Sequence, residues 1–246
     1  PYSLSDNAVY SLCEDREGGI WVGSYFGGVD YYPKSYTYFE KYYPKDGDNN
    51  LHGKRVREFC EDNKGILWIG TEDGGLNRFD PKTKTFSFFA PSFGFTNIHG
   101  LCMVGDKLWV GTFSKGLKIV DTNTGNILKT YQKNDSPRSL IDNSIFAICR
   151  TTTGDIYLGT MFGLLRYNEQ TDDFDRIEEL AGRFVYDIKE DSGGNLWLAT
   201  YVNGAYCYNV SEKKWKNYVH NESNKESLPY DKVLSIFEDS HRQIWL

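Results

Sequence analysis

Paired carboxylates recur in the chain, and two neighbouring carboxyl groups can serve as acid and base in hydrolysis. The pairs are Glu14-Asp15, Glu61-Asp62, Glu190-Asp191 and Glu238-Asp239. Each pair ends a short apolar segment and precedes a turn rich in Gly or polar residues. Because an Asp side chain at such a place accepts hydrogen bonds from the turn backbone, we interpret the pairs as turn residues. They do not predict a catalytic set.

Cysteine and histidine could hold a metal ion, but their spacing argues against it. The cysteines are Cys13, Cys60, Cys102, Cys149 and Cys207, and the histidines are His52, His99, His220 and His241. The first four cysteines stand seven or eight residues before an aromatic anchor, a place that Lys189 and Phe237 also fill, so we expect free buried thiols in packing positions. The histidines lack zinc-ligand spacing. We predict no catalytic residue, no metal and no cofactor for this chain.

These residues are carried by an internal repeat. Its aromatic anchors are Trp21, Trp68, Trp109, Tyr157, Trp197 and Trp245, with successive periods of 47, 41, 48, 40 and 48 residues. Periods of this length are typical of propeller blades. No stretch has the three- and four-residue apolar spacing of a helix, and the coils of a parallel-strand solenoid are usually shorter.

Each period predicts four short strands separated by turn signals. In the second copy these strands, here A to D, are Val56–Glu61, Leu67–Thr71, Leu76–Phe79 and Thr85–Phe89. A small residue follows each anchor by two positions, where it would allow close approach of neighbouring blades. These small residues are Gly23, Gly70, Gly111, Gly159 and Ala199.

We therefore predict an all-β fold: a β-propeller of four-stranded antiparallel blades, with five full blades plus the first two strands of a sixth. The expected blades span residues 1–46, 47–92, 93–134, 135–180, 181–222 and 223–246 of a single partial propeller. A Ser-Leu or Asn-Leu pair opens four of them, at Ser3-Leu4, Asn50-Leu51, Ser139-Leu140 and Ser227-Leu228. Because the last blade is incomplete, we expect further chain on both sides and about seven blades in the whole propeller region.

Composition excludes some functions. The net charge is -6, the pI is about 5.3 and Lys and Arg form no cluster, so nucleic acid is not an expected partner of this domain. The sequence has no run of about 18 apolar residues and no signal-peptide pattern at its start. A membrane connection is expected only through further chain.

One motif resembles a known family. Asn-x-Val-x-x-Ile-x-Glu-Asp, Gly-x-Leu-Trp-Ile-Gly-Thr and Gly-Gly-Leu-x-Arg are similar to the ligand-sensing propeller repeats of bacterial hybrid two-component regulators, and Leu51 to Phe79 follows them closely. Blade three departs with Met103-Val104 in place of Glu-Asp, and blade four has Tyr157 in place of Trp. The resemblance implies a periplasmic sensor region of an inner-membrane protein whose histidine kinase and DNA-binding modules lie in other parts of the polypeptide. It also implies a possible homodimer.

Strand direction predicts where a ligand would bind. Because direction reverses at each strand, the B-to-C loops and the D-to-A connections lie on one face, where rings and polar groups would converge. The candidate ligand-binding residues are Tyr25, Phe26, Glu72, Asp73, His99, Phe113, Phe162, Arg183, Tyr201 and Asn203. We expect an oligosaccharide or another small periplasmic ligand, with rings stacking on sugar faces. The competing interpretation is that these rings only pack against neighbouring loops.

Two other functional classes stay open. A propeller enzyme, such as a lyase or glycan hydrolase, would need acid and base groups at the channel mouth, where Glu72, Asp73, His99 and Asp231 are available. A protein-interaction scaffold is the second class, although the Gly-His and Trp-Asp marks of one such propeller family are missing.

Overall fold

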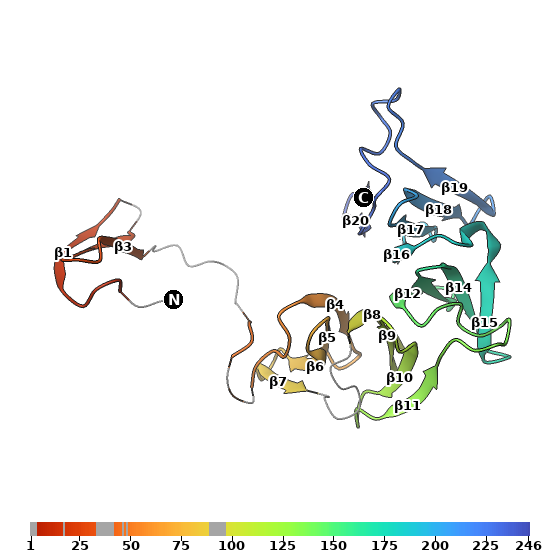
Figure 1. Ribbon diagram of the computed structural model, residues 1–246, viewed down its shortest axis with the longest axis horizontal. Helices are drawn as coiled ribbons and strands as arrows, with labels where there is room; N and C mark the ends of the chain where they lie inside the picture. The colour runs from red at the N-terminus through yellow and green to blue at the C-terminus, as the bar shows by residue number, and fades with distance from the viewer. Residues whose placement is uncertain (1–3, 17, 33–41, 46, 48, 89–96) are drawn as a thin grey trace. The chain divides into compact units, whose positions relative to one another are not determined.

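The computed structural model describes residues 4–16, 18–32, 42–45, 47, 49–88 and 97–246. They contain strands and one 3-10 turn, Glu178–Leu180. The chain divides into two compact units, Pro1–Tyr42 and Tyr43–Leu246, which are described separately (Figure 1). None of the helical segments in the described residues is long and apolar enough to cross a membrane.

The first unit holds one antiparallel sheet of three strands in the order β1-β2-β3. The strands are β1 (Val9–Glu14), β2 (Ile20–Ser24) and β3 (Val29–Tyr32). The fourth strand that the repeat predicts for this blade falls outside the described residues. All six side chains of β1 are exposed, which is expected for a repeat unit that cannot bury its faces alone.

The second unit holds four sheets of four antiparallel strands and a final sheet of two. Blade two is β4 (Val56–Glu61), β5 (Leu67–Thr71), β6 (Gly75–Asp80) and β7 (Thr85–Phe88). Blade three is β8 (Ile98–Val104), β9 (Lys107–Thr112), β10 (Leu117–Asp121) and β11 (Ile127–Tyr131). Blade four is β12 (Ile145–Arg150), β13 (Ile156–Thr160), β14 (Gly163–Asn168) and β15 (Asp173–Ile177). Blade five is β16 (Val185–Glu190), β17 (Leu196–Thr200), β18 (Ala205–Asn209) and β19 (Lys214–Tyr218), and blade six begins with β20 (Phe237–Glu238) and β21 (Ile244–Trp245).

The sheets of the second unit are arranged as propeller blades. The first strands β4, β8, β12 and β16 pack successively against one another, and the last strands lie on the outer side (Figure 1). The predicted all-β propeller fold is thereby confirmed. In blade two, strands A and B match the prediction, strand C is one residue longer at each end, and strand D ends at Phe88, next to the undescribed Phe89.

Small residues in the second strands let neighbouring blades approach closely. A Cβ atom on each of these glycines would crowd the residue that begins the first strand of the next blade. The close pairs are Gly70 against Ile98 Cγ2 at 2.6 Å, Gly111 against Ile145 Cγ2 at 2.8 Å, and Gly159 against Val185 Cγ1 at 2.9 Å. Ala199 occupies this place in blade five and packs in a buried cluster with Val233 and Ile236. The predicted reason for the small residues is therefore confirmed in blades two to five. In the first unit, a Cβ on Gly23 would instead meet the Ser11 hydroxyl of its own blade.

The acidic pairs stabilise turns, as predicted, and the aspartates do more. Each aspartate accepts a hydrogen bond from the indole N–H of its own blade: Trp21 to Asp15 at 3.0 Å, Trp68 to Asp62 at 3.1 Å, Trp197 to Asp191 at 2.8 Å and Trp245 to Asp239 at 2.9 Å. Burial alone would raise the pKa of Asp191, but hydrogen bonds from Asn195 and Trp197 hold that pKa below its ordinary value. The aspartate thus ties the A-to-B turn to the anchor ring.

The glutamates of blades five and six tie each blade to the one before it. Glu190 accepts hydrogen bonds from the backbone N–H and the hydroxyl of Thr152, at 2.7 and 2.9 Å. Glu238 accepts the same two bonds from Ser192, at 2.7 and 2.6 Å. In both cases the donor lies in the A-to-B turn of the preceding blade. We call this contact the glutamate clamp.

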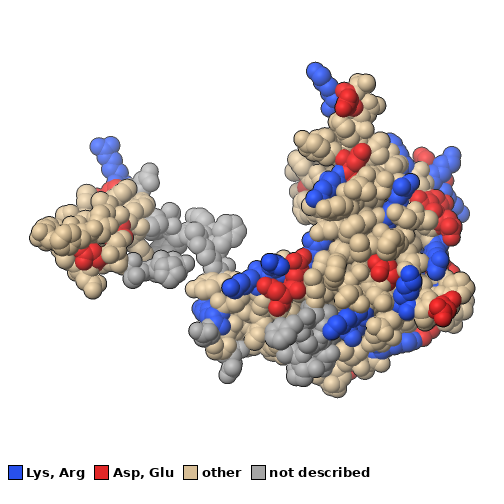
Figure 2. Space-filling view, viewed as in Figure 1, with Lys and Arg blue, Asp and Glu red and all other residues tan. Residues whose placement is uncertain are grey.

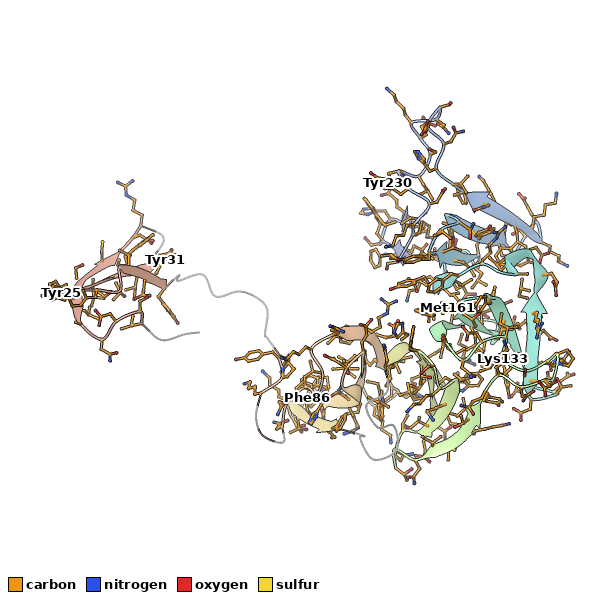
Figure 3. The ribbon with its side chains drawn as sticks, in the orientation of Figure 1. Tyr25, Tyr31, Phe86, Lys133, Met161 and Tyr230 are labelled. Atoms are coloured by element: carbon orange, nitrogen blue, oxygen red, sulfur yellow. The ribbon has the colours of Figure 1, made fainter. Side chains whose placement is uncertain are left out.

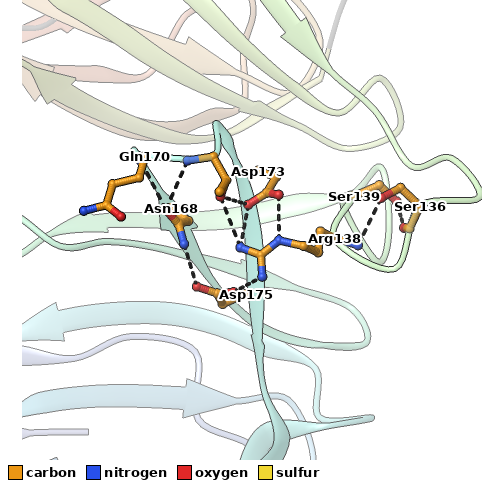
Figure 4. A network of polar contacts seen from close by, with 8 residues as sticks. Ser136, Arg138, Ser139, Asn168, Gln170, Asp173 and Asp175 are labelled. Atoms are coloured by element: carbon orange, nitrogen blue, oxygen red, sulfur yellow. Dashed lines mark hydrogen bonds and ion pairs between the residues drawn. The ribbon is translucent and has the colours of Figure 1, made fainter.

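The long connections fold back onto their own blades. Arg138 donates to both carboxylate oxygens of Asp173, at 2.6 and 2.7 Å, and pairs with Asp175 at 2.8 Å (Figure 4). Its carbonyl oxygen accepts from the N–H of Phe174, so the connection covers the outer edge of β15. Leu140, from the Ser-Leu motif, is buried in the core shared by blades three and four.

The cysteines are free thiols, but their burial differs from the prediction. Cys207 is buried, and Cys60, Cys102 and Cys149 are half-buried and pack against the cores between blades. Burial raises the pKa of each of these four thiols to about 11. The expectation of a buried thiol is wrong for Cys13, which is exposed on the first unit.

We expect the glutamate clamp to contribute measurably to stability. A double-mutant cycle of Glu190→Ala and Thr152→Ala should give a coupling free energy of about 0.5–1.5 kcal/mol, which reports the hydrogen bond from the Thr152 hydroxyl to the carboxylate, because the backbone N–H of residue 152 remains in both Thr152 variants. Chemical denaturation of the four variants measures it. Additive effects of the two substitutions would contradict the clamp.

Candidate functional site

One face of the second unit brings together the B-to-C loops and the D-to-A connections. The backbone N–H of Phe113 donates to the carbonyl of Asn97 at 3.0 Å, and the backbone N–H of Tyr201 donates to the carbonyl of Phe184 at 3.0 Å. In blade two, the backbone N–H of Glu72 donates to the carbonyl of Arg55 at 2.9 Å. These bonds join each loop to the connection that leads into its own blade. The face predicted from strand direction therefore exists; Met161 and Tyr230 are labelled on its loops in Figure 3.

A buried threonine shapes each B-to-C loop. Thr71, Thr112, Thr160 and Thr200 are fully buried at the ends of their strands. In blade three, the Thr112 hydroxyl donates to the Gly116 carbonyl at 2.7 Å and accepts from the Lys115 N–H at 2.9 Å. These two hydrogen bonds close the loop and leave its ring residue, Phe113, facing outward. They explain the threonine in the repeat motif.

Each first strand of blades one to five has a bulge at its second residue. The antiparallel register shifts at the second residue of the strand: at Tyr10 in the first unit, and at Arg57, His99, Phe146 and Tyr186 in the second. Bulges re-aim side chains in this way. The four residues of the second unit line one pocket of about 240 Å³, with Leu234 and Ser235 of blade six.

Aromatic rings connect this axial pocket to the loops. His99 lies 5.7 Å from the Phe113 ring and 4.6 Å from the Phe146 ring, measured between centroids. Phe184 continues the series, at 4.5 Å from Phe146 and 5.3 Å from Tyr201. The result is a continuous aromatic wall from blade three to blade five.

Cations lie over two of the rings on this face. The Arg57 guanidinium is 4.3 Å from the centre of the Tyr186 ring, a contact that crosses from blade two to blade five. The Lys232 ammonium is 4.5 Å from the centre of the Tyr201 ring. Such cation–π contacts fix the orientation of rings that would otherwise turn freely.

His99 is a buried, neutral side chain in this wall. Burial, followed by the positive charge of Arg57, lowers its pKa to about 4. Its Nε2 atom lies 3.9 Å from Glu72 Oε1, a pair that is not ionic at neutral pH because the imidazole is uncharged. Neither ring nitrogen has a hydrogen-bond partner among the described residues.

Other polar groups near this face are also unpaired. Within the described part of the chain, Asn97 Oδ1, Asp142 Oδ2 and Arg183 Nε are buried without a hydrogen-bond partner. All three residues belong to D-to-A connections. These atoms are free to form hydrogen bonds with groups from outside the described residues.

Carboxylates and a lysine form the other end of the axial pocket. Glu58, Asp187 and Lys189 line it. Burial raises the pKa of Glu58 above its ordinary value. Asp187 Oδ2 accepts the Ile236 N–H at 2.9 Å and so joins blade five to blade six. The pocket is thus aromatic toward the loops and charged further along the axis.

The structure brings together four of the ten predicted site residues: Glu72, His99, Phe113 and Tyr201 are in or beside the aromatic wall. Asp73 joins its B-to-C loop to the D-to-A connection of the same blade, because one of its carboxylate oxygens accepts the N–H groups of Lys54 and Arg55. Phe162, Arg183 and Asn203 lie on loops of the same face, where the Phe162 side chain is exposed.

The two remaining predicted residues, Tyr25 and Phe26, belong to the first unit. Their ring centroids are 4.2 Å apart, and Tyr25 lies 4.9 Å from Tyr10. Phe26 is 86% exposed, so its ring is available for contact within that unit. The Phe26 N–H donates to Asp6 at 3.0 Å, which holds the loop in place.

Sequence reasoning missed Arg57, Phe146, Phe184, Tyr186 and Lys232. Four of these lie at or next to the start of a first strand. A comparison of the residues at the second position of each first strand would have shown the signal. That position holds Tyr10, Arg57, His99, Phe146, Tyr186 and Leu234, which are mostly aromatic or polar.

Solved structures similar to this chain define its class as a β-propeller. The extracellular domain of a putative hybrid two-component system from B. thetaiotaomicron is 22% identical with a TM-score of 0.53, covering 98% of this chain and 38% of that one. PorZ, a surface component of the type-IX secretion system of Porphyromonas gingivalis, is 18% identical with a TM-score of 0.61, covering 93% and 35%. Virginiamycin B lyase from Staphylococcus aureus is 13% identical with a TM-score of 0.53, covering 87% and 71%. The chain therefore spans little more than a third of the first two structures.

The family model of the two-component regulator propeller matches residues 3–26, 50–73 and 179–202. Each match covers the connection into a blade and its first two strands, in blades one, two and five. These three segments are therefore similar to the two-component regulator propeller repeats that the motif resembles. No curated protein sequence is similar enough to the chain to count as a match.

We expect His99 to titrate far below ordinary histidines. Its pKa should be about 4, and Arg57→Ala should raise it because a nearby positive charge is removed, whereas Arg57→Lys should change it little. Since the unfolded chain binds this proton more readily, the stability that neutral His99 provides is complete above pH 6.5 and is lost as the pH falls through about 4. NMR titration of the imidazole C–H signals measures the pKa. A midpoint near 6.5 in the folded chain would contradict the burial described above.

Proposed function

We propose that this chain is part of the sensor region of a hybrid two-component regulator and binds an oligosaccharide on the face formed by the B-to-C loops. The aromatic wall that runs from Phe113 to Tyr201 carries this proposal. Aromatic faces bind the apolar faces of sugars, and the unpaired polar atoms beside them can bind hydroxyl groups. Arg183, whose Nε atom has no hydrogen-bond partner among the described residues, is one such group.

The proposal also concerns the cellular location of this region and the signal that it passes to the rest of the polypeptide. Because the similar B. thetaiotaomicron structure is an extracellular domain of a putative hybrid two-component system, we propose a periplasmic location for this region. Binding would be relayed to a histidine kinase and a DNA-binding module in the rest of the polypeptide. A homodimer would couple the two, since a shift in subunit contacts can carry a signal across a membrane.

The His99–Glu72 pair favours an enzyme as the second candidate, because a histidine beside a carboxylate is a common acid and base arrangement. Two features weaken this candidate. A pKa of about 4 makes His99 a poor base at neutral pH. Burial leaves His99 only 6% exposed, so a substrate would have little access to the ring.

Calorimetric titration with a panel of neutral oligosaccharides tests the ligand-binding proposal. Phe113→Ala and Tyr201→Ala should each weaken binding about tenfold, because each removes one aromatic platform. Val210→Ala, at an exposed apolar residue of a C-to-D turn on the opposite face, is the control and should leave affinity unchanged.

The same experiment separates sensing from catalysis. We expect each bound oligosaccharide to be recovered intact by chromatography after prolonged incubation with the chain. Shortened products that disappear in a His99→Gln variant would establish the enzyme instead. Equal affinity in the wild type and both aromatic variants would move the site away from this face.

A further inference from the structure

A second cleft, of about 1010 Å³, lies between blades three and four. Its lining comes from β8 to β11 of blade three and from β12 to β15 of blade four, with their turns. The turns are Gly105-Asp106, Thr153 to Asp155 and Glu169-Gln170. They belong to the A-to-B and C-to-D sets, so this cleft opens on the face opposite the aromatic wall.

The cleft occurs where blade three departs from the repeat. Only Gly105 and Asp106 link β8 to β9, whereas five residues link the first two strands of each other full blade. The glutamate clamp is also missing, because Arg150 stands at the position that Glu190 holds in blade five. Arginine has no acceptor atom and cannot bind the N–H of the turn in blade three. The A-to-B turns of the two blades are therefore not joined by a clamp, although Lys129 and Tyr131 of blade three bind Asp172 of blade four nearby.

In blade three, the anchor ring Trp109 also lacks the carboxylate partner that the anchor tryptophans of other blades have. Val104 stands where the other tryptophan-bearing blades have the aspartate, and the Trp109 indole N–H has no acceptor among the described residues. Cys102 pairs with Trp109 across the β8–β9 ladder, and the Arg150 backbone lies against the Cys102 thiol. The Trp109 indole and the Arg150 side chain thus both line the cleft, in a blade pair that lacks the carboxylates found at these positions in other blades.

Most other charges of the cleft are already paired. Arg166 pairs with Asp155 at 2.7 Å, and Lys129 pairs with Asp172. Asp175 is held by Arg138 from outside the cleft (Figure 4). The charged lining residues with no ion pair among the described residues are Lys107, Arg150, Asp106 and Glu169. Two cations and two carboxylates are therefore available to a ligand.

We propose that this cleft binds a uronic acid residue, a sugar that carries one carboxylate among several hydroxyl groups. Its carboxylate accepts hydrogen bonds from Arg150 and the Trp109 indole N–H and so replaces the carboxylate that the repeat has lost. Its hydroxyl groups donate to Asp106 and Glu169. Those two carboxylates disfavour a ligand with more than one negative charge.

The choice of a sugar rests on the proposed function, while the requirement for a carboxylate rests on the cleft alone. The two sites lie on opposite faces and share no lining residue. Variants of one site therefore leave the other intact, and failure of one proposal can be told from failure of the other. Figure 2 shows that basic and acidic side chains are interspersed on the face of the second unit that it presents. Recognition of a single carboxylate thus depends on local pairing rather than on a broad basic patch.

NMR titration of the ¹⁵N-labelled 246-residue chain tests the proposal. The probes are methyl glucuronoside, methyl galacturonoside, methyl glucoside and acetate, and the signal is the Trp109 indole N–H, assigned with Trp109→Phe. We expect a saturable shift with at least one uronoside and weaker binding of the glucoside and acetate. If the glucoside binds as tightly as the uronosides, the cleft does not require a carboxylate. If acetate binds as tightly, the cleft does not recognise a sugar. If no probe shifts the Trp109 signal, the cleft is not a binding site.

Three variants locate the binding groups. Arg150→Glu, which introduces the residue of blades five and six, should weaken uronoside binding about 10- to 100-fold, because a charge-assisted hydrogen bond is lost and repulsion is added. Arg150→Lys is the conservative control and should retain part of the affinity. Val104→Asp supplies a carboxylate beside Trp109 and should compete with the ligand. Unchanged uronoside affinity in Arg150→Glu, a substitution at an exposed residue, would overturn the proposal even if Val104→Asp fails to fold.

Discussion

The close approach of neighbouring blades at the small residue after each anchor ring is the constraint on which the rest of the second unit depends. Side chains of the next blade occupy the space where a larger residue would put its Cβ atom. This contact sets the first strands β4, β8, β12 and β16 side by side. At that spacing the bulged residues of the second unit meet in one pocket, and Arg57 of blade two reaches Tyr186 of blade five.

Regular and irregular parts of the repeat have different roles. The bond between anchor indole and aspartate recurs in blades one, two, five and six, and the buried threonine of the B-to-C loop recurs in blades two to five. These repeated contacts stabilise the fold. Both ligand-binding candidates use positions that vary between copies. The axial pocket uses the second residue of each first strand, and the cleft uses a blade with a shortened turn and an arginine in place of a glutamate.

The fold could be predicted from the sequence because every copy repeats the same anchors, turns and small residues. Strand direction was enough to place Glu72, His99, Phe113 and Tyr201 on one face. It could not identify Arg57, Phe146 or Tyr186, because simple alternation within a strand does not show a bulge, and only the register of the ladder does. The cleft was not predictable from motifs, since it results from residues that blade three lacks. The blade boundaries and the single-propeller arrangement stay predictions.

The clasp between Arg138 and the outer strand of blade four limits how this protein can assemble. The Phe174 N–H, which an incoming strand would need, already donates to the Arg138 carbonyl at 2.9 Å. A long exposed edge would be a template for sheet extension, and here the chain itself occupies part of that template. Partners of blade four must therefore recognise side chains on its loops or turns, which makes specificity depend on sequence rather than on generic backbone pairing.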